Sequence, residues 1–213
     1  ACLHYGWIKE RYLLALDMDG TLLKSDKTIS PNTSASLNEA SNRGQSICLC
    51  TGRGLAELKD YEGELDFCDY GILLSGCLIY DFKNNQPLEV HSFDTDVFTQ
   101  MMDVVKKEDV MLYLLDSSHS IASQKDVENM PYYNMAIYQS MFESRAFVVE
   151  DIYEYAEVHK DEILKFCLYN PSVDALNQLL KKLEVFPVSC AVVEETAIEV
   201  TPLGITKGAG LEF

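Results

Sequence analysis

Short apolar runs alternate with helical segments from residue 13 to residue 74. The apolar runs have the length and composition of buried strands and cover residues 13–16, 46–50 and 71–74. Ser30 and Pro31 form a favourable helix start, and Gly44 ends the same segment. A second helix is expected from about Leu55. The order β-α-β-α-β predicts an α/β fold with a parallel sheet and right-handed crossovers.

The pattern changes after residue 77. Paired strand-like runs separated by turn residues predict hairpins at residues 77–81 with 88–93 and at 111–115 with 120–123. Helices are expected over residues 94–107 and after Pro171, where leucines recur at helical spacing. Further strands are expected at residues 163–169, 188–193 and 197–201. This block therefore has the pattern of an α+β unit with an antiparallel sheet.

The composition is that of an ordinary globular chain, with 47% hydrophobic and 24% charged residues. A net charge of −17 argues against nucleic acid and anionic membrane surfaces as partners. No apolar run reaches the roughly 18 residues of a membrane span. The seven cysteines are scattered and include no C-x-x-C pair, so neither zinc nor a disulfide framework is indicated. A reducing cytoplasm is the expected location.

Residues 13–23, L-L-A-L-D-M-D-G-T-L-L, place two carboxylates directly after a buried strand. In an open α/β sheet, ligands bind at the carboxyl ends of the strands. Asp17 and Asp19 are unfavourable neighbours unless a cation lies beside them. Oxygen ligands of this kind suit Mg²⁺, so both aspartates are candidate metal ligands.

This run resembles motif I of the haloacid dehalogenase superfamily of phosphatases, and its form is similar to that of the Cof-type subfamily. The resemblance implies that Asp17 is a nucleophile that forms an aspartyl phosphate. It also implies that Asp19 is the general acid and base for the leaving group and the attacking water. Because free Asp has a pKa near ~3.9, Asp19 needs surroundings that raise its pKa.

Two further segments resemble motifs of the same superfamily. C-T-G-R at residues 50–53 resembles motif II, in which a hydroxyl and a following amide hold the phosphoryl group at a helix N-terminus. E-V-T-P-L-G-I-T-K-G resembles motif III, whose lysine, here Lys207, neutralises charge on the nucleophile. Ser75 stands where these proteins usually carry Asn, and Arg53 is open between a phosphate contact and a surface role. The resemblance implies phosphate or substrate contacts for Met18, Gly20, Thr51, Gly52, Arg53, Ser75 and Gly76.

The α+β block resembles the large C2-type cap that Cof-type proteins insert into a Rossmann-like parallel-sheet core. On this basis we expect a discontinuous core at residues 11–83 and 191–213, a cap at residues 84–190, and an N-terminal extension at residues 1–10. The chain ends six residues past Lys207. In the family, a further helix, a strand and an acidic motif IV follow there. We therefore expect a core that is truncated at its C-terminus and a metal site short of carboxylates.

The resemblance implies a Mg²⁺-dependent phosphatase that hydrolyses small phosphorylated metabolites, such as sugar phosphates, through an aspartyl-phosphate intermediate. One alternative is a phosphomutase on the same scaffold. The other is a truncated, inactive fragment that acts at most as a binding module.

Overall fold

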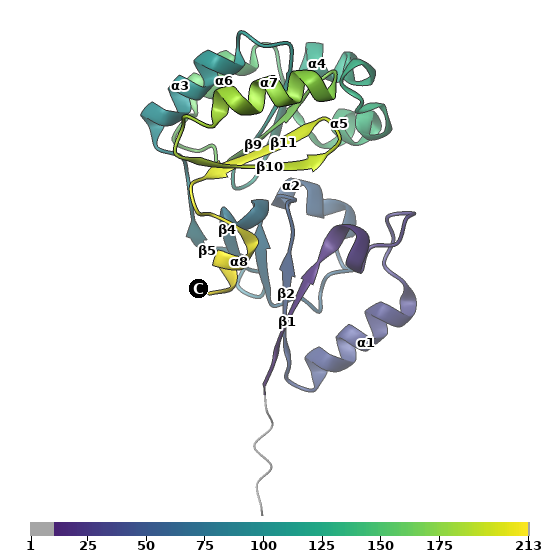
Figure 1. Cartoon of the computed structure of the whole chain (residues 1–213). Helices are drawn as coiled ribbons and strands as arrows, with labels where there is room; N and C mark the ends of the chain where they lie inside the picture. The colour runs from purple at the N-terminus through teal and green to yellow at the C-terminus, as the bar shows by residue number, and fades with distance from the viewer. Residues whose placement is uncertain (1–10, 213) are drawn as a thin grey trace, which may run out of the picture.

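Two sheets organise residues 11–212, the part of the chain that this computed structural model describes (Figure 1). The sheet of the lower lobe has the strand order β1-β2-β3-β4-β5. β1, β2 and β3 are parallel, whereas β4 and β5 continue the sheet as antiparallel neighbours. The strand bounds are β1 Leu13–Asp17, β2 Ser46–Cys50, β3 Tyr70–Leu73, β4 Leu78–Asp81 and β5 Gln86–Val90.

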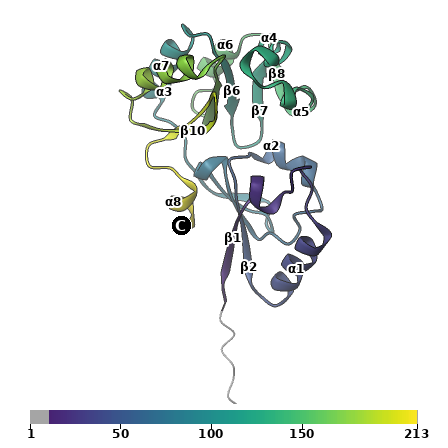
Figure 2. The ribbon, with the colours of Figure 1, turned by 45° about the vertical axis from the view of Figure 1, so that its right-hand side comes forward.

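Two helices flank this sheet from opposite sides in both ribbon views, α1 (Pro31–Asn42) and α8 (Lys207–Leu211) (Figures 1 and 2). Ser30 caps α1 by accepting a hydrogen bond from the Thr33 amide. The short α2 (Leu55–Leu58) follows β2. We call this sheet with α1, α2 and α8 the core lobe. Its parallel β-α-β-α-β start confirms the prediction from the sequence.

The upper lobe, here called the cap lobe, has a six-stranded sheet in the order β10-β11-β9-β6-β7-β8. Its strands are β6 Met111–Leu115, β7 Ser120–Ser123, β8 Phe147–Val149, β9 Lys165–Tyr169, β10 Val188–Glu194 and β11 Ala197–Pro202. Its helices are α3 Thr95–Val105, α4 Gln124–Glu128, α5 Gln139–Arg145, α6 Ile152–Val158 and α7 Val173–Leu183. Single helical turns in the two lobes occupy Met18–Leu22, Lys59–Tyr61, Leu74–Gly76, Met130–Tyr133 and Ala136–Tyr138.

Alternation along the cap strands decides which residues reach the core lobe. Helices α3, α6 and α7 cover the face of the cap sheet that points away from the core lobe (Figure 1). On β9, Phe166 and Leu168 pack in the cluster beneath these helices. The intervening residues Lys165 and Cys167 line the cavity between the lobes. This period of two is the one expected for a strand with two different faces.

Sheet membership differs from the expected domain boundaries on both sides of the insertion. β5 lies within the block assigned to the cap, but it pairs with β4 as a hairpin and extends the core sheet. β11 lies within the part assigned to the core, but it pairs with β9 and β10 in the cap sheet. The chain therefore passes from the core lobe to the cap lobe near residues 91–94 and returns to the core lobe near residues 203–206. The expected extension at residues 1–10 lies outside the described residues.

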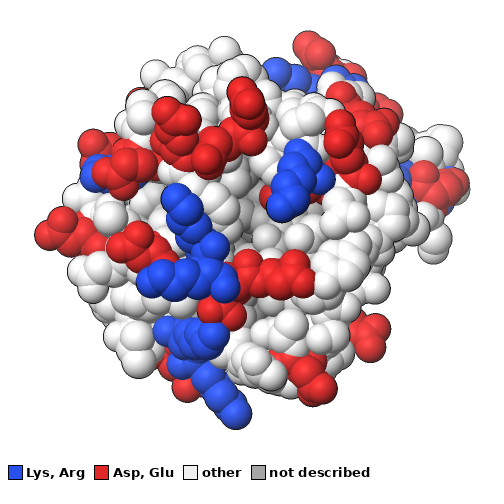
Figure 3. Space-filling model, turned by 90° about the horizontal axis from the view of Figure 1, so that it is seen from above, with Lys and Arg blue, Asp and Glu red and all other residues white. Residues whose placement is uncertain are grey.

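The charged side chains on the surface are in keeping with the net charge of −17. Seen from above, the cap lobe carries several separate groups of acidic side chains, with basic side chains gathered mainly in one band (Figure 3). The cysteines among residues 11–212 are all free. None of the helices in this part of the chain has the length and apolar character needed to cross a bilayer.

Candidate active site

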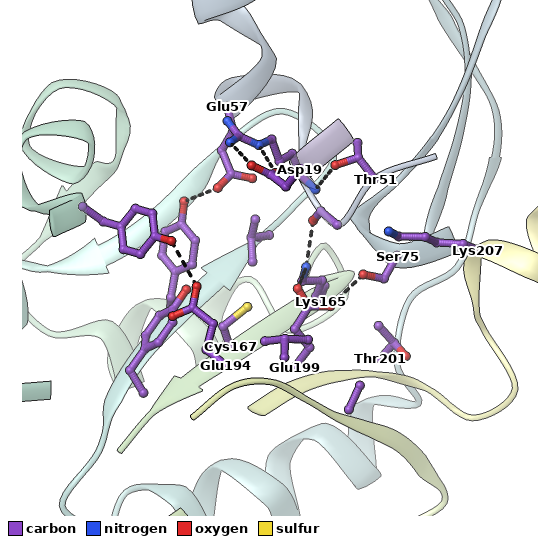
Figure 4. Close-up of a pocket in the computed structure, with 18 of the residues that line it drawn as sticks. Asp19, Thr51, Glu57, Ser75, Lys165, Cys167, Glu194, Glu199, Thr201 and Lys207 are labelled. Atoms are coloured by element: carbon purple, nitrogen blue, oxygen red, sulfur yellow. Dashed lines mark hydrogen bonds and ion pairs between the residues drawn. The ribbon is translucent and has the colours of Figure 1, made fainter. Parts of the chain in front are cut away.

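A cavity of about 770 Å³ lies between the two lobes. The core lobe lines it with residues from the ends of β1 and β2 and from the start of α8, and the cap lobe lines it with β6, β9, β10 and β11 (Figure 4). This volume is within the usual range for small-molecule sites. The expected catalytic residues Asp17, Asp19 and Lys207 all line it.

Asp17 is the last residue of β1 and pairs in register with Cys50 of β2. Because the two strands are parallel, their carboxyl ends meet at the same sheet edge, and Asp17 lies beside the segment that starts at Thr51. Lys207 reaches Asp17 from the opposite end of the sequence, with its Nζ 2.5 Å from Asp17 Oδ1. Both side chains are about 40% exposed, so the pair faces the cavity rather than the core.

Asp19 is held by two cations. Arg53 Nε donates to Asp19 Oδ2 at 2.8 Å and Arg53 Nη2 donates to Oδ1 at 2.9 Å. Lys27 Nζ donates to Oδ1 at 2.8 Å. The Arg53 hydrogen bonds are the largest influence and lower the pKa of Asp19 to about 2. The raised pKa that a general acid needs is therefore not present in this arrangement, because the neighbouring cations outweigh burial.

Thr51 and Gly52 form a tight polar turn after β2. The Thr51 hydroxyl oxygen accepts a hydrogen bond from the Arg53 amide at 3.1 Å, and the Thr51 side chain is buried. The expected contribution from a helix N-terminus stays a prediction. Helix α2 has four residues and begins at Leu55, and the amide of its N-cap, Gly54, already donates to Glu57 Oε2 at 2.8 Å.

The remaining expected contacts divide into two groups. Arg53 and Ser75 line the cavity together with Thr51 and Gly52. Met18, Gly20 and Gly76 are not part of the lining. The Met18 side chain is fully buried in the core, and Gly20 makes a turn at φ +77°. Gly76, at φ +111°, packs against the Thr206 backbone. Backbone contacts from these three residues to phosphate stay predictions.

Several cavity residues were not singled out from the sequence. Lys165 donates to Gly52 O at 2.7 Å and to Glu199 Oε1 at 2.6 Å. Tyr113 donates to Glu57 Oε1 at 3.3 Å, and burial raises the pKa of Glu57. A signal was present, since a lysine at the start of the apolar strand K-F-C-L-Y and a glutamate within A-I-E-V-T are both unusual in buried strands.

The residues that suit a metal are Asp17 and Asp19. Among residues 11–212 there is no group of three or more His, Cys, Asp or Glu side chains placed to hold a metal ion. The two carboxylates nevertheless fit magnesium in kind, because Mg²⁺ is commonly bound by one or two carboxylates together with water and substrate phosphate.

Residues 14–213 match the haloacid dehalogenase-like hydrolase family. This match covers nearly the whole chain, and the chain belongs to this family. The resemblance found in the motifs is thereby confirmed.

YxeH of Bacillus subtilis is 28% identical over 130 residues, which is 60% of this chain and 48% of YxeH. The 5-amino-6-(5-phospho-D-ribitylamino)uracil phosphatase YitU of the same organism is 32% identical over 100 residues, 46% of this chain and 37% of YitU. These matches span at most about half the length of the curated relatives. A haloacid dehalogenase-like hydrolase from B. subtilis superposes with a TM-score of 0.79 at 17% identity, over 94% of this chain and 76% of that chain. This likeness confirms the α/β fold class.

Proposed function

We propose that the protein hydrolyses phosphomonoesters of small metabolites, sugar phosphates or similar compounds, with Mg²⁺ as cofactor. The observation that carries the proposal is the meeting of Asp17, Asp19, Thr51 and Lys207 in one cavity, although Asp17 and Lys207 lie 190 residues apart in the chain. Membership of the haloacid dehalogenase-like hydrolase family supports the same chemistry. The name of YitU describes a phosphatase of a small phosphorylated compound.

The chemistry proceeds in two halves on this proposal. An Asp17 oxygen bonds to phosphorus as the ester P–O bond breaks, and the leaving oxygen takes a proton from Asp19. Water then attacks the phosphorus of the aspartyl phosphate, Asp19 accepts the proton of that water, and Asp17 and inorganic phosphate are released. Lys207 stabilises the negative charge that builds up on Asp17 and the transferring group.

The ionised state of Asp19 sets a condition on the first half of the reaction. With Arg53 and Lys27 bound to it, Asp19 carries no proton to give at neutral pH. A phosphate group that enters the cavity is an alternative anionic partner for both cations. We propose that Arg53 and Lys27 exchange their hydrogen bonds to Asp19 for hydrogen bonds to the substrate phosphate. The pKa of Asp19 then rises, so that substrate binding favours the protonated form that acts as the general acid.

Magnesium would be held by the Asp17 carboxylate and the backbone carbonyl of Asp19, so that the Asp19 carboxyl group stays available for proton transfer. The second oxygen of Asp17 has no hydrogen-bond partner among the described residues and is available to a cation. When bound, the metal supplies positive charge next to the nucleophile and the phosphoryl oxygens. With one side-chain carboxylate from residues 11–212 in this role, we propose that this site binds Mg²⁺ weakly in the absence of substrate.

Phosphate release from an aryl phosphate, with and without added Mg²⁺, tests the proposal. We expect turnover that needs the metal and that the substitution Asp17→Asn abolishes. Asp26→Asn is the matched control, because Asp26 is an exposed carboxylate paired with Lys24 at 2.9 Å and lies outside the cavity. Turnover retained in Asp17→Asn would refute the assigned nucleophile.

A further inference from the structure

A buried ion pair of the cap lobe reaches across into the core lobe. Lys165 of β9 and Glu199 of β11 lie on neighbouring strands, with Nζ and Oε1 2.6 Å apart. The Lys165 side chain is 3% exposed and the Glu199 side chain 18%. Lys165 also donates to the Gly52 carbonyl at 2.7 Å, and Glu199 Oε2 accepts from the Ser75 hydroxyl at 2.7 Å. We call these four groups the polar bridge (Figure 4).

The polar bridge is built from contacts that each satisfy a buried charge. A buried ammonium or carboxylate is costly unless its hydrogen-bonding capacity is filled. Within the cap lobe, Lys165 and Glu199 satisfy each other only in part. Gly52 and Ser75, both from the core lobe, supply the other partners. In this arrangement of the two lobes, each of the two charged groups therefore has a second partner, supplied by the core lobe.

The contact to Gly52 bears on the segment proposed to hold phosphate. The Gly52 carbonyl and the Arg53 amide belong to the same peptide unit. Lys165 binds the oxygen end of this unit, and the Thr51 hydroxyl oxygen accepts from its N–H end at 3.1 Å. Because the Thr51 oxygen is engaged as an acceptor, its own hydrogen is free to donate to a phosphoryl oxygen.

The space around Gly52 shows how closely the polar bridge fits this segment. A Cβ at position 52 would lie 3.0 Å from Glu199 Oε1, 3.2 Å from Lys165 Nζ and 3.3 Å from Ser75 Oγ. All three contacts are tighter than ordinary van der Waals distances. A side chain at position 52 would therefore displace these groups by a few tenths of an ångström, because Lys165, Glu199 and Ser75 close over the peptide.

We infer that Lys165 is a positioning residue that couples closure of the cap lobe to the phosphate-binding segment at residues 51–53. With the lobes together, the polar bridge fixes the Gly52–Arg53 peptide and thereby orients Thr51. With the lobes apart, the peptide loses its partner and Lys165 loses one of its two acceptors. This inference rests on the proposed function in that it takes residues 51–53 as the phosphate contact.

The test compares Lys165→Met with Lys182→Met. Lys182 pairs with Glu108 at 2.6 Å, so the control removes a more exposed lysine–glutamate pair from the cap lobe, away from the core lobe. Small-angle X-ray scattering measures the radius of gyration, which grows as the lobes separate. Calorimetric titration with inorganic phosphate measures the phosphate affinity, which depends on residues 51–53 in this inference. We expect Lys165→Met to increase the radius of gyration and to weaken phosphate binding about tenfold or more. We expect Lys182→Met to match the wild type in both.

A second variant separates the loss of the Lys165 contact from misfolding caused by an unpaired buried charge. Lys165→Met leaves the Glu199 charge without its partner, whereas Lys165→Met combined with Glu199→Gln removes both charges at similar volume. A purely structural role would lower the melting temperature without changing phosphate affinity in the folded protein. An unchanged scattering profile in the folded double variant, or unchanged phosphate affinity, overturns the inference. If wild type binds phosphate and shows these differences but hydrolyses no ester, the proposed function fails and the inference stands.

Discussion

Gly76 is the position where the structure predicts the largest effect of adding a single methyl group. Its φ of +111° lies in a region that residues with a side chain rarely adopt, and an added Cβ would lie 2.4 Å from the Thr206 carbonyl oxygen. This is roughly 1 Å short of ordinary contact, and the obstacle is backbone. The conformational strain alone costs about 1–3 kcal/mol, and the clash adds to it.

Gly76→Ala should therefore lower the free energy of unfolding by at least about 2 kcal/mol. Thr206 is the N-cap of α8 and directly precedes Lys207, so a shift of Thr206 moves Lys207 away from Asp17. A displacement of 1 Å in a catalytic group can cost on the order of 100-fold in rate. We expect a loss of phosphate release in Gly76→Ala that exceeds what its unfolded fraction explains.

Gly208→Ala provides the matched comparison. A Cβ at Gly208 would meet nothing nearer than Thr206 Oγ1 at 3.7 Å, and alanine favours helix over glycine by up to about 1 kcal/mol. Urea unfolding followed by circular dichroism should rank the proteins Gly208→Ala, wild type and Gly76→Ala, from most to least stable. A Gly76→Ala protein within about 0.5 kcal/mol of wild type would refute this reasoning.

Three further predictions concern side chains in both lobes. Arg53→Met removes the main cause of the low Asp19 pKa, so an NMR titration should show that pKa rising from about 2 towards 3.8; no change would mean that Lys27 suffices to hold it. Because this folded-state pKa is depressed, the Arg53 contribution to stability is present above pH 3.8 and should disappear as pH falls through about 2. Asp94→Ala removes the N-cap that binds two amides at the start of α3, which should cost about 1 kcal/mol in urea unfolding, and an unaltered midpoint would contradict this. Phe166→Ala empties a fully buried site among the cap aromatics and should cost about 3–5 kcal/mol; a cost under about 1 kcal/mol would show that this cluster is loosely packed.

The core sheet and the ends of its strands could be predicted because the information is local. The apolar run before Asp17 sets a buried strand, and the turn residues after it fix the strand end where the carboxylate emerges. Thr51 follows the neighbouring parallel strand, so its proximity to Asp17 follows from topology alone. Lys207 could be placed through the motif around it, although no local pattern states which strand it approaches.

The cap contribution could not be predicted because it depends on contacts distant in sequence. Lys165 and Gly52 are 113 residues apart, and Ser75 and Glu199 are 124 residues apart. Which residues of β9 and β11 face the core lobe depends on sheet register, and a shift of one residue would turn Lys165 towards the helices instead. The direction of the Asp19 pKa shift could not be predicted for the same reason, because Arg53, the largest influence on it, lies 34 residues away in the sequence.

The domain boundaries illustrate how pairing decides membership. Residues 86–90 fall within the segment expected to form the insertion, but their hairpin partner β4 belongs to the core sheet. Residues 197–202 overlap the start of the motif with Lys207, yet the strand that they form pairs with β9 of the cap sheet. β11 is therefore the element that carries Glu199 of the polar bridge and leads back to Lys207.

The central claim, that Asp17 becomes phosphorylated, is tested most directly by isolating the phosphoenzyme. The protein is incubated with Mg²⁺ and a reactive phosphate ester, quenched in acid, digested, and analysed by tandem mass spectrometry. We predict the mass of one phosphoryl group on the peptide that contains Asp17, and its absence in Asp17→Asn. Ester hydrolysis without any phosphorylated aspartate, or with the phosphoryl group on another residue, would contradict the account.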